Sequence, residues 1–294
     1  MRLLVIFAAW APDDGENSQK WLAWYENILA ERFPGDDKIV AANWGSADCV
    51  ERRLEGLPGI LEFGRVPEEL HVNSDAAPFQ LGLSLAREIL PDYDYVLFAH
   101  TKGVSYAFES IENWRNDVSK TVFDRRLVSD FIQTAPPSLI ADRGHMVTGA
   151  DSIKTFRART GAMGFVLPFF FGATMTVYYA PARLVAELIE RMPGEFLSKN
   201  LLSQGMTRYM FESATPSLLT MLDAKPAFLC GPRFNERLNP HVSYDFDPRH
   251  NSALVMREFE KREAEGEAYQ QIPVPYVFGA AEDVYRSNVA FKLT

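Results

Sequence analysis

His100, Thr101 and Lys102 stand side by side in the sequence and are followed by Gly103. An imidazole can take up or release a proton, a hydroxyl can donate or accept a hydrogen bond, and an ammonium can bind a phosphate group. The run before them, residues 93–99, is mostly apolar, which predicts a strand covered on both faces. In an open α/β sheet, ligands bind outside the carboxyl ends of the strands. The triplet is therefore a candidate binding site; the alternative is a strand end at which polar residues meet water.

Other candidates follow strands that the sequence predicts over residues 3–8, 39–42 and 145–149. In chain order these candidates are Trp10, Asn43 and Asp151. Asp75 can cap a predicted helix that extends to residue 90, although Ser74 can do the same, and its carboxylate can also touch a ligand. Because the carboxyl ends of parallel strands meet at one edge of a sheet, we expect Trp10, Asn43 and Asp75 to converge on one cleft with His100.

The elements that would position these residues alternate between strand and helix. A helix over roughly residues 18–33 has an apolar stripe at helical spacing, formed by Trp21, Trp24, Tyr25, Ile28 and Leu29. With the strands on either side it makes a β-α-β unit, which joins parallel strands by a right-handed crossover. A later helix that begins near Ser110 includes Arg115. We expect an α/β fold with a Rossmann-like, mainly parallel central sheet and helices on both faces.

Composition narrows the classes of partner. The chain has 294 residues, a net charge of −9 and 47% hydrophobic residues, which indicates a sizeable core and disfavours a nucleic-acid partner. Its two cysteines, Cys49 and Cys230, make neither a disulfide framework nor a zinc cluster and suit a reducing compartment. No apolar stretch reaches the roughly 18 residues that span a bilayer. We expect a cytoplasmic protein, with a peripheral membrane contact over residues 165–173 as an open alternative.

Four potential metal ligands lie close together near the carboxyl end. They are His241, Asp245, Asp247 and His250. Their spacing matches no strong metal motif, so ordinary loop polarity is the favoured interpretation. A divalent metal such as manganese or magnesium stays an alternative.

The order of strand, helix, strand, capped helix and strand with a polar triplet resembles nucleotide-sugar transferases of the GT-A kind. In that fold the triplet is usually Asp-x-Asp, which holds a divalent cation against the diphosphate. With His-Thr-Lys in its place and Trp114-Arg115 on the next helix, the chain resembles glycosyltransferase-like proteins of the rhamnan-synthesis F-like group. Gly172 and the pair Tyr178-Tyr179 match this group loosely, while Ala173 stands where a polar residue is usual. The resemblance covers about residues 1–225, the expected nucleotide-sugar-binding and catalytic domain; residues 226–294 are expected to be a C-terminal extension packed on it.

The resemblance implies transfer of a hexosyl or deoxyhexosyl group from a nucleotide-sugar donor to a saccharide, a lipid-linked acceptor or another hydroxyl, in bacterial surface polysaccharide synthesis. The leaving diphosphate needs positive charge, which His100, Lys102 and Arg115 can supply without a metal cofactor. An inverting transfer also needs a base, for which the candidates are Asp151 and Glu212. The residues expected to bind the donor are Trp10, Asn43, Asp75, Thr101 and Arg115.

Two other classes fit the same residues. One is a GT-A-like domain that binds a sugar or nucleotide without turnover, since a lapsed enzyme would also lack Asp-x-Asp. The other is a different α/β enzyme that acts on a phosphorylated small molecule.

Overall fold

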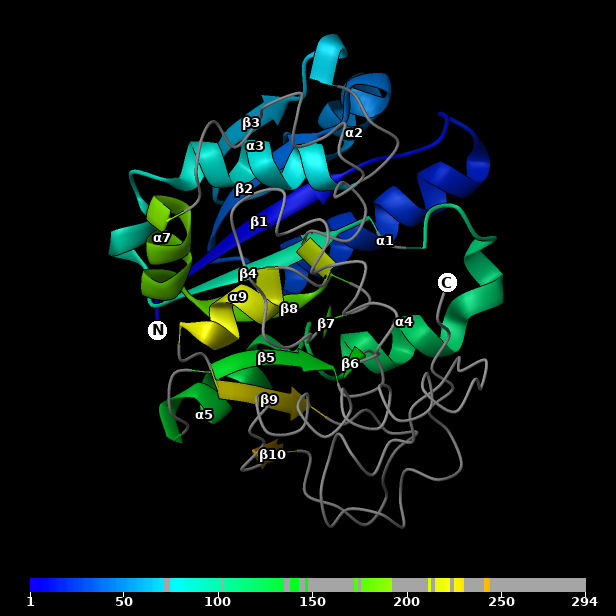
Figure 1. The fold of residues 1–294 in the computed structure, drawn as a ribbon. Coiled ribbons are helices and arrows are strands. Elements are labelled where there is room, and N and C mark those ends of the chain that lie inside the picture. Colours follow the sequence, from blue (N-terminus) through cyan, green and yellow to red (C-terminus); the bar gives the residue numbers. More distant parts are fainter. Residues whose placement is uncertain are drawn as a thin grey trace, which may run out of the picture.

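An eight-stranded sheet forms the centre of the computed structural model (Figure 1). The structure describes residues 1–70, 75–101, 103–134, 138–142, 146–147, 172–173, 176–191, 211–212, 215–222, 225–229 and 241–243. The sheet has the order β10-β9-β5-β8-β4-β1-β2-β3. Its strands are β1 (Leu3–Ala9), β2 (Asp37–Ala42), β3 (Ile60–Arg65), β4 (Tyr95–His100), β5 (Ser138–Asp142), β8 (Tyr178–Pro181), β9 (Lys225–Leu229) and β10 (His241–Ser243).

The sheet is mainly parallel, as predicted. Strand β1 pairs in parallel with β2 and β4, β2 pairs in parallel with β3, and β5 pairs in parallel with β9. Strand β8 is antiparallel to both of its neighbours, β4 and β5, and β10 is antiparallel to β9. Two reversals across β8 restore the direction, so β3, β2, β1, β4, β5 and β9 all run the same way.

Helices cover both faces of this sheet, which confirms the expected fold class. The helices are α1 (Glu16–Arg32), α2 (Ala47–Leu54), α3 (Ala76–Ala86), α4 (Glu112–Ser119), α5 (Arg125–Thr134), α7 (Ala182–Arg191) and α9 (Thr215–Met221). Short 3-10 turns join them at η1 (Trp44–Ser46), η2 (Glu68–Leu70), η3 (Leu90–Asp92) and η4 (Phe108–Ile111).

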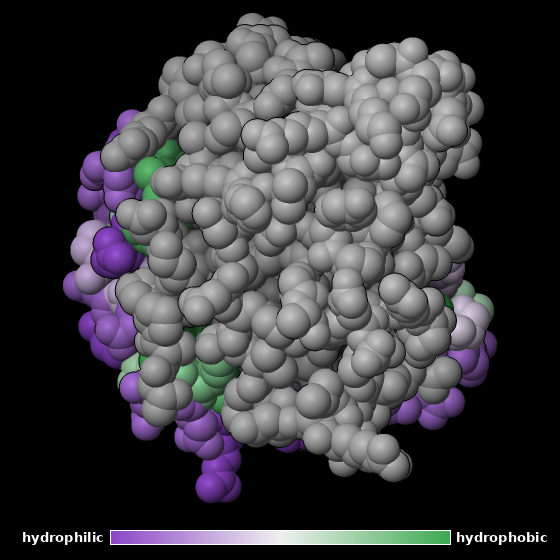
Figure 2. Space-filling model, turned by 60° about the horizontal axis from the view of Figure 1, so that its bottom comes forward, coloured by the Kyte–Doolittle hydropathy of each residue, from purple (hydrophilic) through white to green (hydrophobic). Residues whose placement is uncertain are grey.

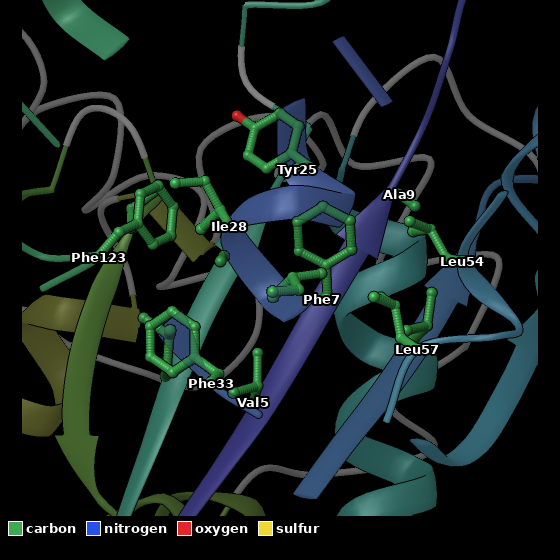
Figure 3. Close-up of a cluster of buried hydrophobic side chains, with 14 of the residues drawn as sticks. Val5, Phe7, Ala9, Tyr25, Ile28, Phe33, Leu54, Leu57 and Phe123 are labelled. Carbon is green, nitrogen blue, oxygen red and sulfur yellow. The ribbon is translucent and has the colours of Figure 1, made fainter. Parts of the chain in front are cut away.

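The alternation of side chains along β1 separates the two faces. Val5 and Phe7 point into a core cluster with Tyr25, Ile28 and other residues of α1 (Figure 3). The predicted α1 stripe is confirmed, since its residues other than the half-buried Trp24 are buried. Ile6 points to the other face, where a Cβ built on Gly82 of α3 would lie 2.6 Å from its Cγ2. This close approach fixes α3 against the sheet.

Several boundaries differ from the expectations. The helix after Asp75 ends at Ala86 rather than residue 90, and the helix expected near Ser110 begins as η4. The strand expected over 145–149 is β6 (Met146–Val147), which pairs with β7 (Gly172–Ala173) in a separate two-stranded sheet. The sheet position beside β8 is instead occupied by β5, which follows the Pro136-Pro137 pair. Its apolar run is too short to predict a strand from the sequence.

Among the described residues, the exposed large apolar side chains are Met1, Trp44, Leu61 and Tyr106. At the rim of the face in Figure 2 the described residues are mostly hydrophilic, with apolar ones between them in small groups. Within the same described part of the chain, no helix has both the length and the apolar character needed to cross a membrane.

Candidate functional site

The carboxyl ends of three parallel strands meet at one edge of the sheet. The Asn43 amide donates to the carbonyl oxygen of Ala9 at 2.9 Å, and the Thr101 amide donates to the carbonyl oxygen of Ala8 at 3.2 Å. These bonds join the loops after β2 and β4 to the end of β1. Trp10, Asn43 and His100 therefore lie along a single edge, as the sequence predicts.

His100 forms a pair with Asp75 at this edge. Its Nδ1 lies 3.1 Å from Oδ2 of Asp75, and the two side chains are only 11% and 16% exposed. The imidazole ring faces α3, with its centroid 5.9 Å from that of Phe79. When the imidazole is neutral, this contact with an ionised carboxylate requires the hydrogen to be on Nδ1 and the lone pair on Nε2. The pair therefore fixes both the orientation and the tautomer of His100.

Asp75 is not a helix cap in the usual sense. It occupies the N-cap position of α3, but its side chain makes no capping hydrogen bond. The prediction of a plain cap is therefore wrong, because the carboxylate binds His100 instead. The contact brings Asp75 and His100 together, as the expected convergence requires, while contact of Asp75 with a ligand stays a prediction.

Thr101 joins two loops. Its Oγ1 accepts a hydrogen bond from the Trp10 amide at 2.8 Å and donates one to the Trp10 carbonyl oxygen at 2.6 Å. The side chain is buried, and these two bonds use its donor and one of its lone pairs. This geometry favours a role in holding the loop after β1 over direct contact with a donor.

Asn43 is also occupied by local structure. It is fully buried, and its Oδ1 accepts from the Trp44 amide at 3.1 Å, which caps η1. The next residue, Trp44, is 48% exposed and presents an aromatic ring at the same edge. Exposed aromatic rings stack on nucleic-acid bases with useful affinity. Trp44 is thus a better candidate for nucleoside contact than Asn43. The sequence shows an aromatic residue just after β2, but only the structure shows that its ring is exposed.

Arg115 does not join the His100 pair in the way expected. Its guanidinium carbon lies 3.6 Å from the ring centroid of Phe108 and 5.4 Å from that of Trp21, and it donates to the Phe108 carbonyl oxygen. Trp21 belongs to α1, on the face of the sheet opposite α3. Burial lowers the pKa of Arg115 from its ordinary value. These contacts favour a structural role through cation–π packing over binding of a diphosphate beside His100.

Helix α1 holds the segment after β4 through several backbone contacts. Asn17 donates through Nδ2 to the carbonyl oxygens of Val104 and Tyr106, at 3.2 and 3.0 Å, and its Oδ1 accepts from the Phe108 amide at 2.9 Å. The Trp21 indole also donates to the Tyr106 carbonyl oxygen at 3.0 Å. The loop that follows the His-Thr-Lys triplet is therefore fixed in place, as a preorganised site requires.

Glu212 directly follows a residue that lies on the α3 side of the sheet. The preceding residue, Phe211, packs against Phe79 with ring centroids 4.9 Å apart, and Phe79 also contacts His100. This arrangement places the neighbour of Glu212, one of the two candidate bases, on the same face as His100, and the role of Glu212 as a base stays a prediction.

The remaining expectations fall on residues outside the described part of the chain. These are Lys102, Asp151, Asp245, Asp247 and His250. Within the described ranges, no group of three or more His, Cys, Asp or Glu side chains is placed to hold a metal ion.

Comparison with known proteins gives limited information. No family model and no curated protein matches the chain. Among solved structures, it is similar to 4-diphosphocytidyl-2C-methyl-D-erythritolsynthase from Anaerococcus prevotii DSM 20548, with a TM-score of 0.40 and 12% identity over 88% of this chain and 95% of that one. A similarity of this size supports no functional assignment.

Proposed function

We propose that the protein is a glycosyltransferase of the rhamnan-synthesis F-like group, which moves a hexosyl or deoxyhexosyl group from a nucleotide sugar to a saccharide or another hydroxyl acceptor. The supporting observation is the His100–Asp75 pair, held at the edge where the loops after β1, β2 and β4 meet. Such an edge is where open α/β sheets bind their ligands. A buried, oriented imidazole there is suited to acid–base chemistry on a hydroxyl.

The parts of the donor can be assigned to different residues of this edge. Trp44, which is half exposed, is proposed to stack on the base. Lys102 follows Thr101, whose backbone is bonded to β1, and is proposed to neutralise the diphosphate. An ammonium at this place in the triplet would repel a divalent cation and attract a phosphate, so we propose a transfer that needs no metal.

The first experiment measures release of nucleoside diphosphate from a panel of UDP-, GDP- and dTDP-sugars, with and without saccharide acceptors. Asp75→Asn keeps the size of the side chain but removes the charge that faces His100. Hydrogen bonds to charged groups are worth about 1.5–3 kcal/mol, so turnover should fall about 10- to 150-fold. Asp130→Asn, which affects an exposed pair with Arg126 on α5, is the matched control and should leave turnover unchanged. Binding of nucleotide sugars with no turnover at all would instead favour a binding protein.

A second experiment tests the role of Lys102. Turnover should survive an excess of chelator, and Lys102→Ala should lower it by about one to two powers of ten through loss of a charged hydrogen bond. Activity that disappears with the chelator and returns with manganese would refute the metal-free proposal.

A further inference from the structure

Three buried hydroxyl groups of the described residues lack a hydrogen-bond partner. They are the Oη of Tyr178 and the Oγ1 atoms of Thr176 and Thr215, on side chains with exposed fractions of 0%, 1% and 1%. A buried hydroxyl without a partner costs about 1–3 kcal/mol, so native structures contain few of them. Three such hydroxyls, two of them only two residues apart in the chain, point to a ligand that completes their hydrogen bonds.

Tyr178 lies on the side of β4 where Phe79 and Phe98 adjoin His100. Tyr178 pairs with Phe98 in the sheet and stacks on its ring with centroids 5.0 Å apart. Thr176 lies two residues before Tyr178, just outside the paired part of β8. Burial raises the pKa of Tyr178 well above its ordinary value, and the nearby Asp75 carboxylate raises it further. Thr215 begins α9, shortly after Phe211, whose ring lies 6.3 Å from that of Phe98.

The backbone at Thr176 supports this interpretation. Its φ is 46°, a left-handed conformation that is unusual for a β-branched residue. Such a conformation costs on the order of 1–3 kcal/mol and occurs mainly at functional sites. The strain therefore falls on a residue whose hydroxyl is unpartnered, just before the start of β8.

The surroundings indicate the chemistry of the ligand. The three hydroxyls are neutral and can both donate and accept, which suits a ligand with several hydroxyl groups of its own. Phe79, Phe98 and Phe211 are buried against one another next to Tyr178 and give this region the apolar character that suits the C–H face of a sugar ring. The Asp75 carboxylate would repel a phosphate.

We propose that Tyr178, Thr176 and Thr215 form a subsite that binds the hydroxyl groups of a pyranose ring beside His100. The kind of ligand rests on the proposed function, whereas the location rests on the unpartnered hydroxyls alone. The ring can belong to the acceptor or to the sugar of the donor, since both present the same groups. Because the hydroxyls are buried, a ligand can reach them only in a less populated conformation in which they are accessible. The apparent affinity is reduced by that population, so the binding of an isolated sugar should be weak.

The test uses the full chain and two hydroxyl deletions, Tyr178→Phe and Thr215→Val. Binding of methyl glycosides of glucose, galactose, rhamnose and N-acetylglucosamine is followed by saturation-transfer NMR, and binding of UDP-, GDP- and dTDP-sugars and the corresponding free diphosphates by calorimetry. Each deletion should weaken binding of the sugar about 3- to 10-fold, the effect of one neutral hydrogen bond. Neither should lower the urea midpoint of unfolding, because each removes a hydroxyl that has no partner in the folded protein.

Tyr179→Phe is the matched control. Tyr179 is the next residue of β8 and faces the other side of the sheet, where its hydroxyl donates to the Val122 carbonyl oxygen at 2.7 Å. This variant should lower the unfolding midpoint and leave sugar binding unchanged.

Each outcome decides between the possibilities. Weaker binding of methyl glycosides assigns the subsite to the acceptor, and weaker binding of a nucleotide sugar but not of its diphosphate assigns it to the donor sugar. Unchanged affinities in both deletion variants, or no binding of any of these sugars to the wild type, would overturn the proposal. If glycosides bind through Tyr178 and no nucleotide sugar binds or turns over, the subsite stands and the proposed transferase function falls.

Discussion

Replacing Gly103 with alanine should destabilise the protein because two costs coincide at this position. Gly103 has a φ of +92°, which L side chains rarely adopt, and the left-handed region costs roughly 1–2 kcal/mol for a residue with a Cβ. The new Cβ would also lie 2.7 Å from Cη2 of Trp21 and 2.9 Å from Cδ1 of Ile111. Overpacking of this kind costs typically about 1–3 kcal/mol. We therefore expect the free energy of unfolding to fall by about 2–5 kcal/mol.

Urea unfolding followed by tryptophan fluorescence measures this change, since the clash is with an indole ring. The midpoint should fall while the dependence on urea stays the same, because the surface exposed on unfolding does not change. Gly56→Ala is the control: a Cβ at Gly56 meets nothing within 4 Å, so the effect should be within about 1 kcal/mol of zero. A midpoint for Gly103→Ala equal to that of the wild type would refute the assigned backbone conformation and its contact with Trp21.

Three further predictions concern other contacts. Thr101→Val should lower the free energy of unfolding by about 1–3 kcal/mol in urea titrations, because it removes both bonds to the Trp10 backbone, and Thr101→Ser should restore most of it. Lys38→Met should lower it by about 2–4 kcal/mol, since the buried ammonium donates to the carbonyl oxygens of Phe33, Asp36 and Pro58 at 2.6, 2.8 and 2.7 Å. Tyr93→Phe should make stability less sensitive to alkaline pH, because burial and the hydrogen bond to Asp37 raise the pKa of Tyr93 from 10 to about 12.

The sign of the alkaline effect follows from proton binding. Between pH 10 and about 12 the folded protein keeps the Tyr93 proton while the unfolded chain loses it, so this stabilisation is present below pH 10 and is lost as the pH rises to 12. The stability advantage of the wild type over Tyr93→Phe should therefore shrink by about 3 kcal/mol across that window. A constant difference would contradict the raised pKa. For Thr101 and Lys38, variants as stable as the wild type would contradict the bonds described.

The amino-terminal β-α-β unit and the strand before His100 could be predicted because their signals are local. The apolar stripe of α1 and the apolar run of β4 are each contained in one segment, and both are found where expected. The direction of β8 could not be predicted in the same way. Its apolar run is compatible with either direction, and the antiparallel choice depends on pairing with β4, about 80 residues earlier in the chain.

The candidate site is harder to predict because each of its side chains can bind either a neighbour in the chain or a residue far away in the sequence, and only the fold decides between them. Asp75 looks like a cap from the sequence, yet it binds His100 once the approach of Gly82 to Ile6 has set α3 against the sheet. Arg115 looks like a phosphate ligand, yet two aromatic rings, one of them on α1, provide a closer partner. In both cases the deciding contact lies in another element.

Neighbouring residues of the triplet have different roles because their side chains lie on different faces of the sheet. Side chains alternate along a strand, so His100 and Thr101 leave the end of β4 in opposite directions. Thr101 binds the Trp10 backbone, while His100 faces α3, Asp75 and the side of Tyr178. Substitutions at Thr101 and at the α1 contacts of the following loop should therefore mainly change stability. Substitutions at Asp75 and Tyr178 should instead change ligand binding and turnover, because Asp75 orients the imidazole and the Tyr178 hydroxyl makes no hydrogen bond within the fold.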